Sequence, residues 1–140
     1  MDNLWNVGQK TLIDALAYLH VSQGARGLHV NTRMAMSCFH EFDTSTCRYR
    51  LTHDGLALAK RSNYWVAYEW LKANGYRRRQ LEKHSMRSIN YWNPTTEMYA
   101  SISRDGSVFL HPEDGNWKGR TRRLTIADLK KELTNATTVL

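Results

Sequence analysis

The amino-acid sequence predicts an α+β fold in which N-terminal helices and a β-hairpin precede a small antiparallel meander and a C-terminal helix. Apolar residues recur at three- and four-residue spacing over 3–22, the pattern of a helix with one buried face. Between 88 and 111, apolar and polar residues alternate on both sides of Asp105-Gly106, a pair that suits a type I′ hairpin turn because both residues tolerate positive φ. Near the C-terminus, Thr125 and Asp128 have the spacing of a capping box at the start of a helix.

Composition favours one compact domain over residues 1–140, with a helical and hairpin part (1–87) followed by the meander and last helix (88–140). The chain is 41% hydrophobic and 24% charged, which excludes a disordered tail and a collagen-like repeat. Two cysteines are too few for a disulfide framework, and the apolar runs are far shorter than the roughly 20 residues of a membrane span. We therefore expect a cytoplasmic protein without a cofactor and without membrane contact.

Two helices are predicted before the hairpin. The first covers 3–22, where Asp2 or Asn3 caps its start and Gly24 ends it in a left-handed conformation. The second is a short helix that is capped by Asn31 or Thr32 and runs through Ala35.

The hairpin is predicted from two short runs, Ser37–Phe42 and Cys47–Leu51, with the polar tetrapeptide 43–46 between them. If Phe42 pairs with Cys47, Glu41 lies directly across from Arg48, which is a favourable cross-strand pair.

The remaining elements follow from turn and capping residues. Thr52 is expected to cap a helix over 54–61, and the next helix begins at 62 or 63 and ends at Gly75. A further basic helix is predicted over 76–86. The meander strands and the start of the last helix are expected at 88–92, 97–103, 108–111 and 125.

Positive charge concentrates in the middle of the chain. The formal net charge is +7, and residues 51–90 carry eight basic and three acidic side chains. A basic run of this kind suits phosphate oxygens, because arginine offers a planar fork of donors. The predicted nucleic-acid contacts in this run are Arg77, Arg78, Arg79, Lys83 and Arg87.

A second basic cluster consists of Lys118, Arg120, Arg122 and Arg123. It is interpreted either as a loop that contacts phosphates or as an edge strand whose charges prevent aggregation. Trp92 and Trp117 lie near the ends of strand-like runs and are the candidate aromatic contacts for bases.

Residues 37–61 contain a motif with a familiar order. A strand ends in Leu51-Thr52, and after two further residues Gly55 opens a helix. This stretch resembles the wing-to-helix segment of winged-helix DNA-binding domains. The resemblance implies a DNA-binding function for this part of the chain.

Metal and catalytic chemistry receive less support. Cys38, His40, Cys47 and His53 are zinc-ligand types, but their spacing is not that of a known zinc motif, and an apolar hairpin face explains them equally. We expect no bound metal. Two sets place a base beside carboxylates: His40-Glu41 with Asp43, and His111 with Glu113 and Asp114. Hairpin alternation sends His40 and Glu41 to opposite faces, and the second set lies in a Pro/Gly loop where acidic residues usually serve turn geometry. The sequence therefore predicts no catalytic residues.

Two functions are compatible with these features. The first is a non-catalytic protein that binds DNA or RNA through phosphate contacts of the basic helical segment. The second is a small inhibitor of the viral or mobile-element type that blocks a nucleic-acid-processing machine by protein–protein contact, since Trp and Arg are also frequent interface anchors. A homodimer is compatible with both functions.

Overall fold

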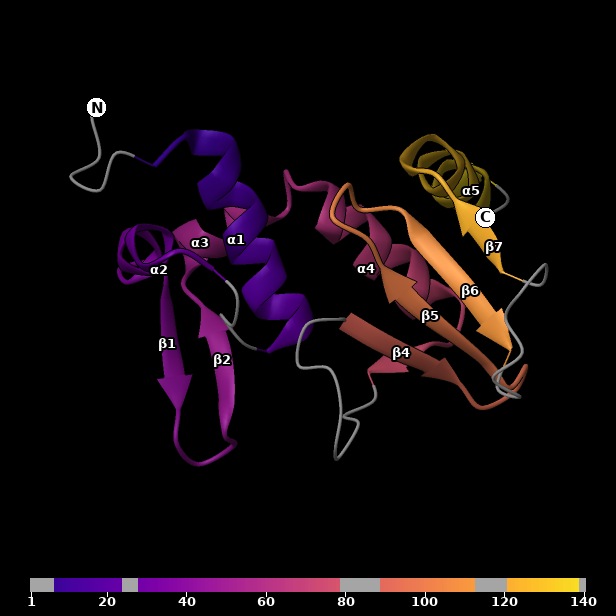
Figure 1. The fold of residues 1–140 in the computed structure, drawn as a ribbon, viewed down its shortest axis with the longest axis horizontal. Coiled ribbons are helices and arrows are strands. Elements are labelled where there is room, and N and C mark those ends of the chain that lie inside the picture. Colours follow the sequence, from indigo (N-terminus) through magenta and orange to yellow (C-terminus); the bar gives the residue numbers. More distant parts are fainter. Residues whose placement is uncertain (1–6, 24–27, 79–88, 113–120, 139–140) are drawn as a thin grey trace. The chain divides into compact units, whose positions relative to one another are not determined.

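The computed structural model describes residues 7–23, 28–78, 89–112 and 121–138 (Figure 1). These residues form five helices, a two-stranded antiparallel hairpin and a five-stranded antiparallel sheet, so the predicted α+β class is confirmed. The chain divides into two compact units, Met1–Trp65 and Val66–Leu140. Among the helices of the described ranges, none is both long enough and apolar enough to cross a membrane.

The first unit is built around α1 (Gln9–Ser22), which contacts α2 (Val30–Met36), α3 (His53–Ala59) and the hairpin. The residues of α1 that are buried are Ile13, Ala15, Leu16, Ala17, Leu19 and Val21. The residue that follows α1, Gln23, is left-handed with φ 59°, whereas the sequence predicted this conformation for Gly24. Gly24 and the predicted caps Asp2 and Asn3 lie outside the described residues. The second helix begins earlier than predicted, because its cap is His29 and not Asn31 or Thr32: His29 Nδ1 accepts the Asn31 N–H at 3.1 Å.

The hairpin consists of β1 (His40–Asp43) and β2 (Arg48–Leu51). Its register differs from the predicted one by two residues, so Glu41 lies across from Arg50 and not from Arg48. The cause is the turn, in which Cys47 adopts a left-handed φ of 55° and leaves the strand. A shift of two residues keeps every side chain on its predicted face. The Arg50–Glu41 ion pair, at 2.9 Å, therefore forms on the face where an opposite-charge pair was expected.

Thr52 caps α3 as predicted, because its hydroxyl accepts the Gly55 N–H at 3.1 Å. The same hydroxyl donates to the Phe39 carbonyl at 3.2 Å, and the Thr52 N–H donates to that carbonyl at 2.9 Å. Gly55 fits here because its backbone approaches Phe39 closely. A Cβ built on Gly55 would lie 2.2 Å from the Phe39 carbonyl oxygen. The backbone of α3 is thus held directly against the residue that precedes β1.

α4 (Asn63–Ala73) begins and ends near its predicted bounds. Gly75, with φ 83°, ends it, and the Tyr76 N–H donates to the Leu71 carbonyl at 2.9 Å. This is the glycine-terminated helix end that the sequence predicted. The predicted basic helix over 76–86 is wrong at its start, because Arg77–Arg78 form strand β3. Residues 79–86 lie outside the described part of the chain.

The five-stranded sheet has the order β3-β4-β5-β6-β7. Its strands after β3 are β4 (Ile89–Asn93), β5 (Met98–Ile102), β6 (Val108–Pro112) and β7 (Arg122–Leu124). Each neighbouring pair is antiparallel. Figure 1 shows α4 passing behind β5 and β6. The buried sheet residues on the helix-covered face include Tyr91, Ala100, Ile102, Val108, Leu110 and Leu124.

The loop between β5 and β6 is not the predicted type I′ turn. That turn requires positive φ at both central residues, whereas in this loop Gly106 has φ 89° and Asp105 does not. Asp105 accepts the Ser107 N–H at 2.9 Å and the hydroxyls of Ser103 and Ser107, so its carboxylate organises a longer loop. These hydrogen bonds hold the pKa of Asp105 well below its usual range.

α5 (Ile126–Thr138) begins with the predicted capping box. The Thr125 N–H donates to the Asp128 carboxylate at 3.0 Å, and the Asp128 N–H approaches the Thr125 hydroxyl at 3.3 Å. Leu129 is fully buried, and Glu132 accepts a hydrogen bond from the Trp70 indole. These contacts join α5 to α4.

Candidate nucleic-acid interface

Strand alternation separates the predicted arginines of the five-stranded sheet. Arg77 pairs with Trp92 and Arg78 pairs with Tyr91, which is buried on the helix-covered face. Since directly paired residues share a face, Arg78 belongs to the helix-covered face and Arg77 to the outer one. By the same reasoning, Arg123, which pairs with Phe109, belongs to the outer face, whereas Arg122 pairs with the buried Leu110. Each edge strand therefore contributes one arginine to the outer face.

The register aligns four side chains of the outer face in a row across the sheet. Arg77 pairs with Trp92, Trp92 with Tyr99, and Tyr99 with His111. Each partner lies on the next strand, so the row runs at right angles to the strands. We call Arg77, Trp92, Tyr99 and His111 the outer row. It begins with a cation at the β3 edge and continues as three rings.

The rings of this face contact one another. The Trp92 and Tyr99 centroids are 4.7 Å apart, and the Phe109 and His111 rings are parallel within 7° at 6.4 Å. The Arg123 guanidinium lies 5.8 Å from the Phe109 centroid, within the range of a cation–π contact. All four rings are only half-buried. They form an ordered aromatic surface that keeps part of its area accessible.

His111 is held by hydroxyl groups on both ring nitrogens. Ser101 Oγ lies 3.1 Å from Nε2, and Thr121 Oγ1 lies 3.3 Å from Nδ1. Partial burial lowers the pKa of His111, so the imidazole is neutral at pH 7. Because a hydroxyl both donates and accepts, either protonation state of the ring can keep both partners. The plane of His111 is therefore fixed parallel to that of Phe109.

Arg123 is positioned by the β5–β6 loop. Its Nη2 donates to the Asp105 carboxylate at 2.8 Å and to the Ser107 hydroxyl at 3.2 Å. The Arg123 side chain remains 52% exposed. A guanidinium carries five N–H donors, so this arrangement orients the group and leaves donors for a further acceptor.

The electrostatic character of the face is positive. The described strands of this sheet place two arginines, Arg77 and Arg123, on the outer face and contain neither Asp nor Glu. Asp105, the carboxylate that contacts Arg123, lies in a loop. The strands thus offer an anion no competing negative charge.

The structure describes only part of the predicted interface. Arg77, Arg78, Arg122, Arg123 and Trp92 are described, and Arg122 and Arg123 do lie on an edge strand, the second of the two interpretations of their cluster. The predicted residues outside the described ranges are Arg79, Lys83, Arg87, Trp117, Lys118 and Arg120. The interface predicted from the sequence did not include Tyr99, Phe109 or His111. Their alternation with the buried positions of β5 and β6 was the available signal.

The proposed zinc-ligand types do not gather in the hairpin. Cys38 and Cys47 are both exposed, and His53 lies 3.5 Å from Asp54 at the start of α3. His40 Nδ1 lies 2.8 Å from the Met36 carbonyl, and its ring packs against Tyr49. Within the described ranges, no group of three or more His, Cys, Asp or Glu side chains is arranged to hold a metal ion.

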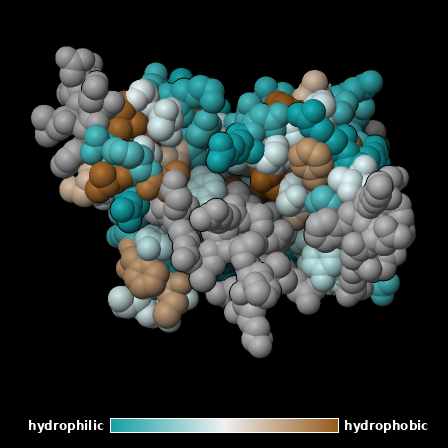
Figure 2. Space-filling view, viewed as in Figure 1, coloured by the Kyte–Doolittle hydropathy of each residue, from teal (hydrophilic) through white to brown (hydrophobic). Residues whose placement is uncertain are grey.

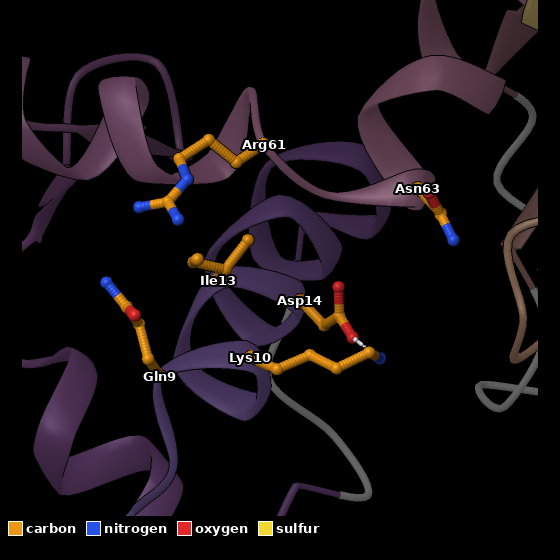
Figure 3. Close-up of a pocket in the computed structure, with 6 residues that line it drawn as sticks. All are labelled: Gln9, Lys10, Ile13, Asp14, Arg61 and Asn63. Carbon is orange, nitrogen blue, oxygen red and sulfur yellow. Dashed lines mark hydrogen bonds and ion pairs between the residues drawn. The ribbon is translucent and has the colours of Figure 1, made fainter.

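The first unit contains a small cavity of about 240 Å³, shown in Figure 3. Its lining residues are Gln9, Lys10, Ile13, Asp14, Arg61 and Asn63. Asp14 accepts from Lys10 at 2.9 Å and from the Ser62 hydroxyl at 2.7 Å. The hydrogen bond to Asp14 raises the pKa of Lys10, so the two side chains are already paired with each other. The cavity therefore resembles a structural ion-pair site more than a catalytic one.

Comparison of the chain with protein-family models, with curated proteins and with solved structures finds no match.

Proposed function

We propose that this protein binds single-stranded nucleic acid, without catalysis, through the outer face of its five-stranded sheet. The observation that carries the proposal is the outer row, in which Trp92, Tyr99 and His111 follow Arg77 at successive register positions. Base stacking on exposed aromatic side chains contributes about 1–3 kcal/mol per base, and arginines supply the phosphate contacts. This is a different surface from the basic helix that the sequence suggested.

A single strand fits this face better than a duplex. In a duplex the flat faces of the bases are stacked on one another, whereas unpaired bases can turn toward a protein ring. The rings of this face lie on strands of a sheet, which presents a broad surface and not a ridge that enters a groove. The positive net charge of the chain adds a sequence-independent attraction to either DNA or RNA.

The test is a titration of a labelled twelve-nucleotide single strand at about 50 mM salt, followed by fluorescence anisotropy. Trp92→Ala should weaken binding by about 5- to 150-fold, the equivalent of one lost stacking contact. The matched control is Phe42→Ala, because Phe42 is a 50% exposed ring on the hairpin and outside the sheet. This control should bind within twofold of the wild type. Equal affinities of the wild type and a folded Trp92→Ala variant would overturn the proposal.

A protein-binding inhibitor remains the second candidate. Val30, Met34 and Phe42 are large apolar side chains with 43–52% of their surface exposed, all in the first unit. Val30 and Met34 are four residues apart in α2 and share one side of it. Figure 2, viewed as Figure 1, shows hydrophobic residues at the surface around α2. If this surface carries the function, Met34→Ala abolishes capture of the partner protein, and Trp92→Ala leaves it intact.

A further inference from the structure

The arrangement of cations and rings on the outer face also indicates how the ligand lies. On the outer face of the described strands, the arginines occur at the two edges, Arg77 on β3 and Arg123 on β7. The rings lie on β4, β5 and β6, between these edges. A polyanion that ran along the strands would follow one edge and meet one arginine. A polyanion that crosses the strands meets both arginines and passes every ring.

On the basis of the proposed function, we infer that the bound single strand crosses the sheet from β3 to β7 and occupies a site of about three to six nucleotides. Four strand-to-strand steps separate β3 from β7. At about 4.8 Å per step the width is about 19 Å. A nucleic-acid strand advances about 3.4 Å per nucleotide in a duplex, so 19 Å holds about six nucleotides at that rise and about three when the backbone is stretched twofold.

The number of rings agrees with this length. Trp92, Tyr99 and His111 lie on three successive strands, and Phe109 lies beside His111 on the same strand. Three strands of rings offer stacking partners for about three bases, and small sheet-based single-strand modules stack two or three. The two arginines would then contact phosphates near the two ends of the bound segment, with Arg77 and Arg123 acting as independent contacts.

The experiment is a length series of oligothymidylates from two to twelve nucleotides, measured by competition at several salt concentrations. Wild-type affinity should rise steeply up to about six nucleotides and only slightly beyond. With eight nucleotides, Arg77→Ala and Arg123→Ala should each weaken binding several-fold, and each should reduce the log–log salt slope by about 0.7, the value for one lost single-strand phosphate contact. With two nucleotides, which cannot reach both edges, either single substitution should have less than half of that effect on affinity.

Matched controls come from the neighbouring residues. Arg78→Ala and Arg122→Ala remove the same charge from the same edge strands but on the helix-covered face, so the eight-nucleotide affinity should stay within twofold. Arg123→Lys keeps a positive charge and should restore most of the affinity that Arg123→Ala loses. If no oligonucleotide binds, the proposed function fails together with this inference. If oligonucleotides bind in a Trp92-dependent manner but affinity rises evenly to twelve nucleotides, or if Arg78→Ala weakens binding as much as Arg77→Ala, the crossing path is wrong and the proposed function stands.

Discussion

The close approach of α3 to Phe39 makes Gly55→Ala a direct test of how the first unit is built. The new methyl group would lie 2.2 Å from the Phe39 carbonyl oxygen and 3.1 Å from Phe39 Cβ. Ordinary contacts of this kind begin near 3.4 Å. Both obstructing positions are backbone or next to it, so no flexible side chain can turn away. Either α3 or the segment before β1 must move by about 1 Å.

The loss of folding free energy caused by that movement can be estimated from the local hydrogen bonds and the packing. The Phe39 carbonyl accepts from the Thr52 N–H and the Thr52 hydroxyl, and that hydroxyl also caps α3 at Gly55. Loss of the cap costs about 1 kcal/mol, loss of a backbone hydrogen bond about 1 kcal/mol, and overpacking about 1–3 kcal/mol. Alanine has a higher helix propensity than glycine, which offsets this loss by about 1 kcal/mol. The net loss of stability should be about 2–4 kcal/mol.

Urea denaturation followed by circular dichroism measures this loss. With a slope of about 2 kcal/mol per molar, the midpoint should fall by about 1–2 M. Gly8→Ala is the control, because a Cβ there meets nothing within 4 Å and its φ of −63° suits alanine. This control should change the stability by less than about 1 kcal/mol. A Gly55→Ala protein as stable as the wild type would show that helix propensity outweighs the contact and would refute the reasoning.

Gly75→Ala should destabilise the end of α4 by about 1–3 kcal/mol, since φ 83° is strained for any side chain, and denaturation measures it. Thr125→Ala removes the capping box of α5 and should cost about 1 kcal/mol in the same assay. Asp105 has a lowered pKa, so its carboxylate stabilises the fold above pH 3.8 and this contribution is lost as the pH falls below that value. Melting curves of Asp105→Asn between pH 6 and 2 should therefore show a weaker acid dependence than those of the wild type. Burial lowers the pKa of His111, so protonation of this ring is less favourable in the folded protein than in the unfolded chain. The free energy of unfolding should therefore decrease as the pH falls below about 6.5. His111→Gln should make the melting temperature depend less on pH between 7.5 and 5.

The features that the sequence predicted correctly are local. The Thr52 cap, the Gly75 helix end and the Thr125–Asp128 box each depend on residues at most five positions apart, and the structure contains all three. The hairpin register depends in addition on the turn. Cys47 adopts a left-handed conformation, which only a few per cent of non-glycine residues have, so the sequence did not predict it.

The basic run shows why the candidate site was only partly predictable. Helical spacing favoured a helix after Tyr76, but Arg77 pairs with Trp92, 15 residues further along the chain, and Arg78 pairs with Tyr91, 13 residues further. Tertiary pairing of this kind overrides local propensity. The outer row depends on three such pairings in succession, and one register error would send Tyr99 or His111 to the other face. The sequence therefore indicates which basic and aromatic residues are candidates, but it does not predict which of them share one face of the sheet.

Gln23 has a consequence for how the first unit opens. Its side-chain amide accepts the Tyr49 N–H at 2.9 Å and donates to the Tyr49 carbonyl at 3.4 Å, as a neighbouring peptide group would. The same amide donates to the His20 carbonyl in the last turn of α1. The Gln23 amide thus hydrogen-bonds both β2 and the last turn of α1, so local unfolding of either element breaks hydrogen bonds that hold it to the other. In native-state hydrogen exchange, the Tyr49 amide should open together with the final turn of α1, so that helix and hairpin form one cooperative unit of local unfolding.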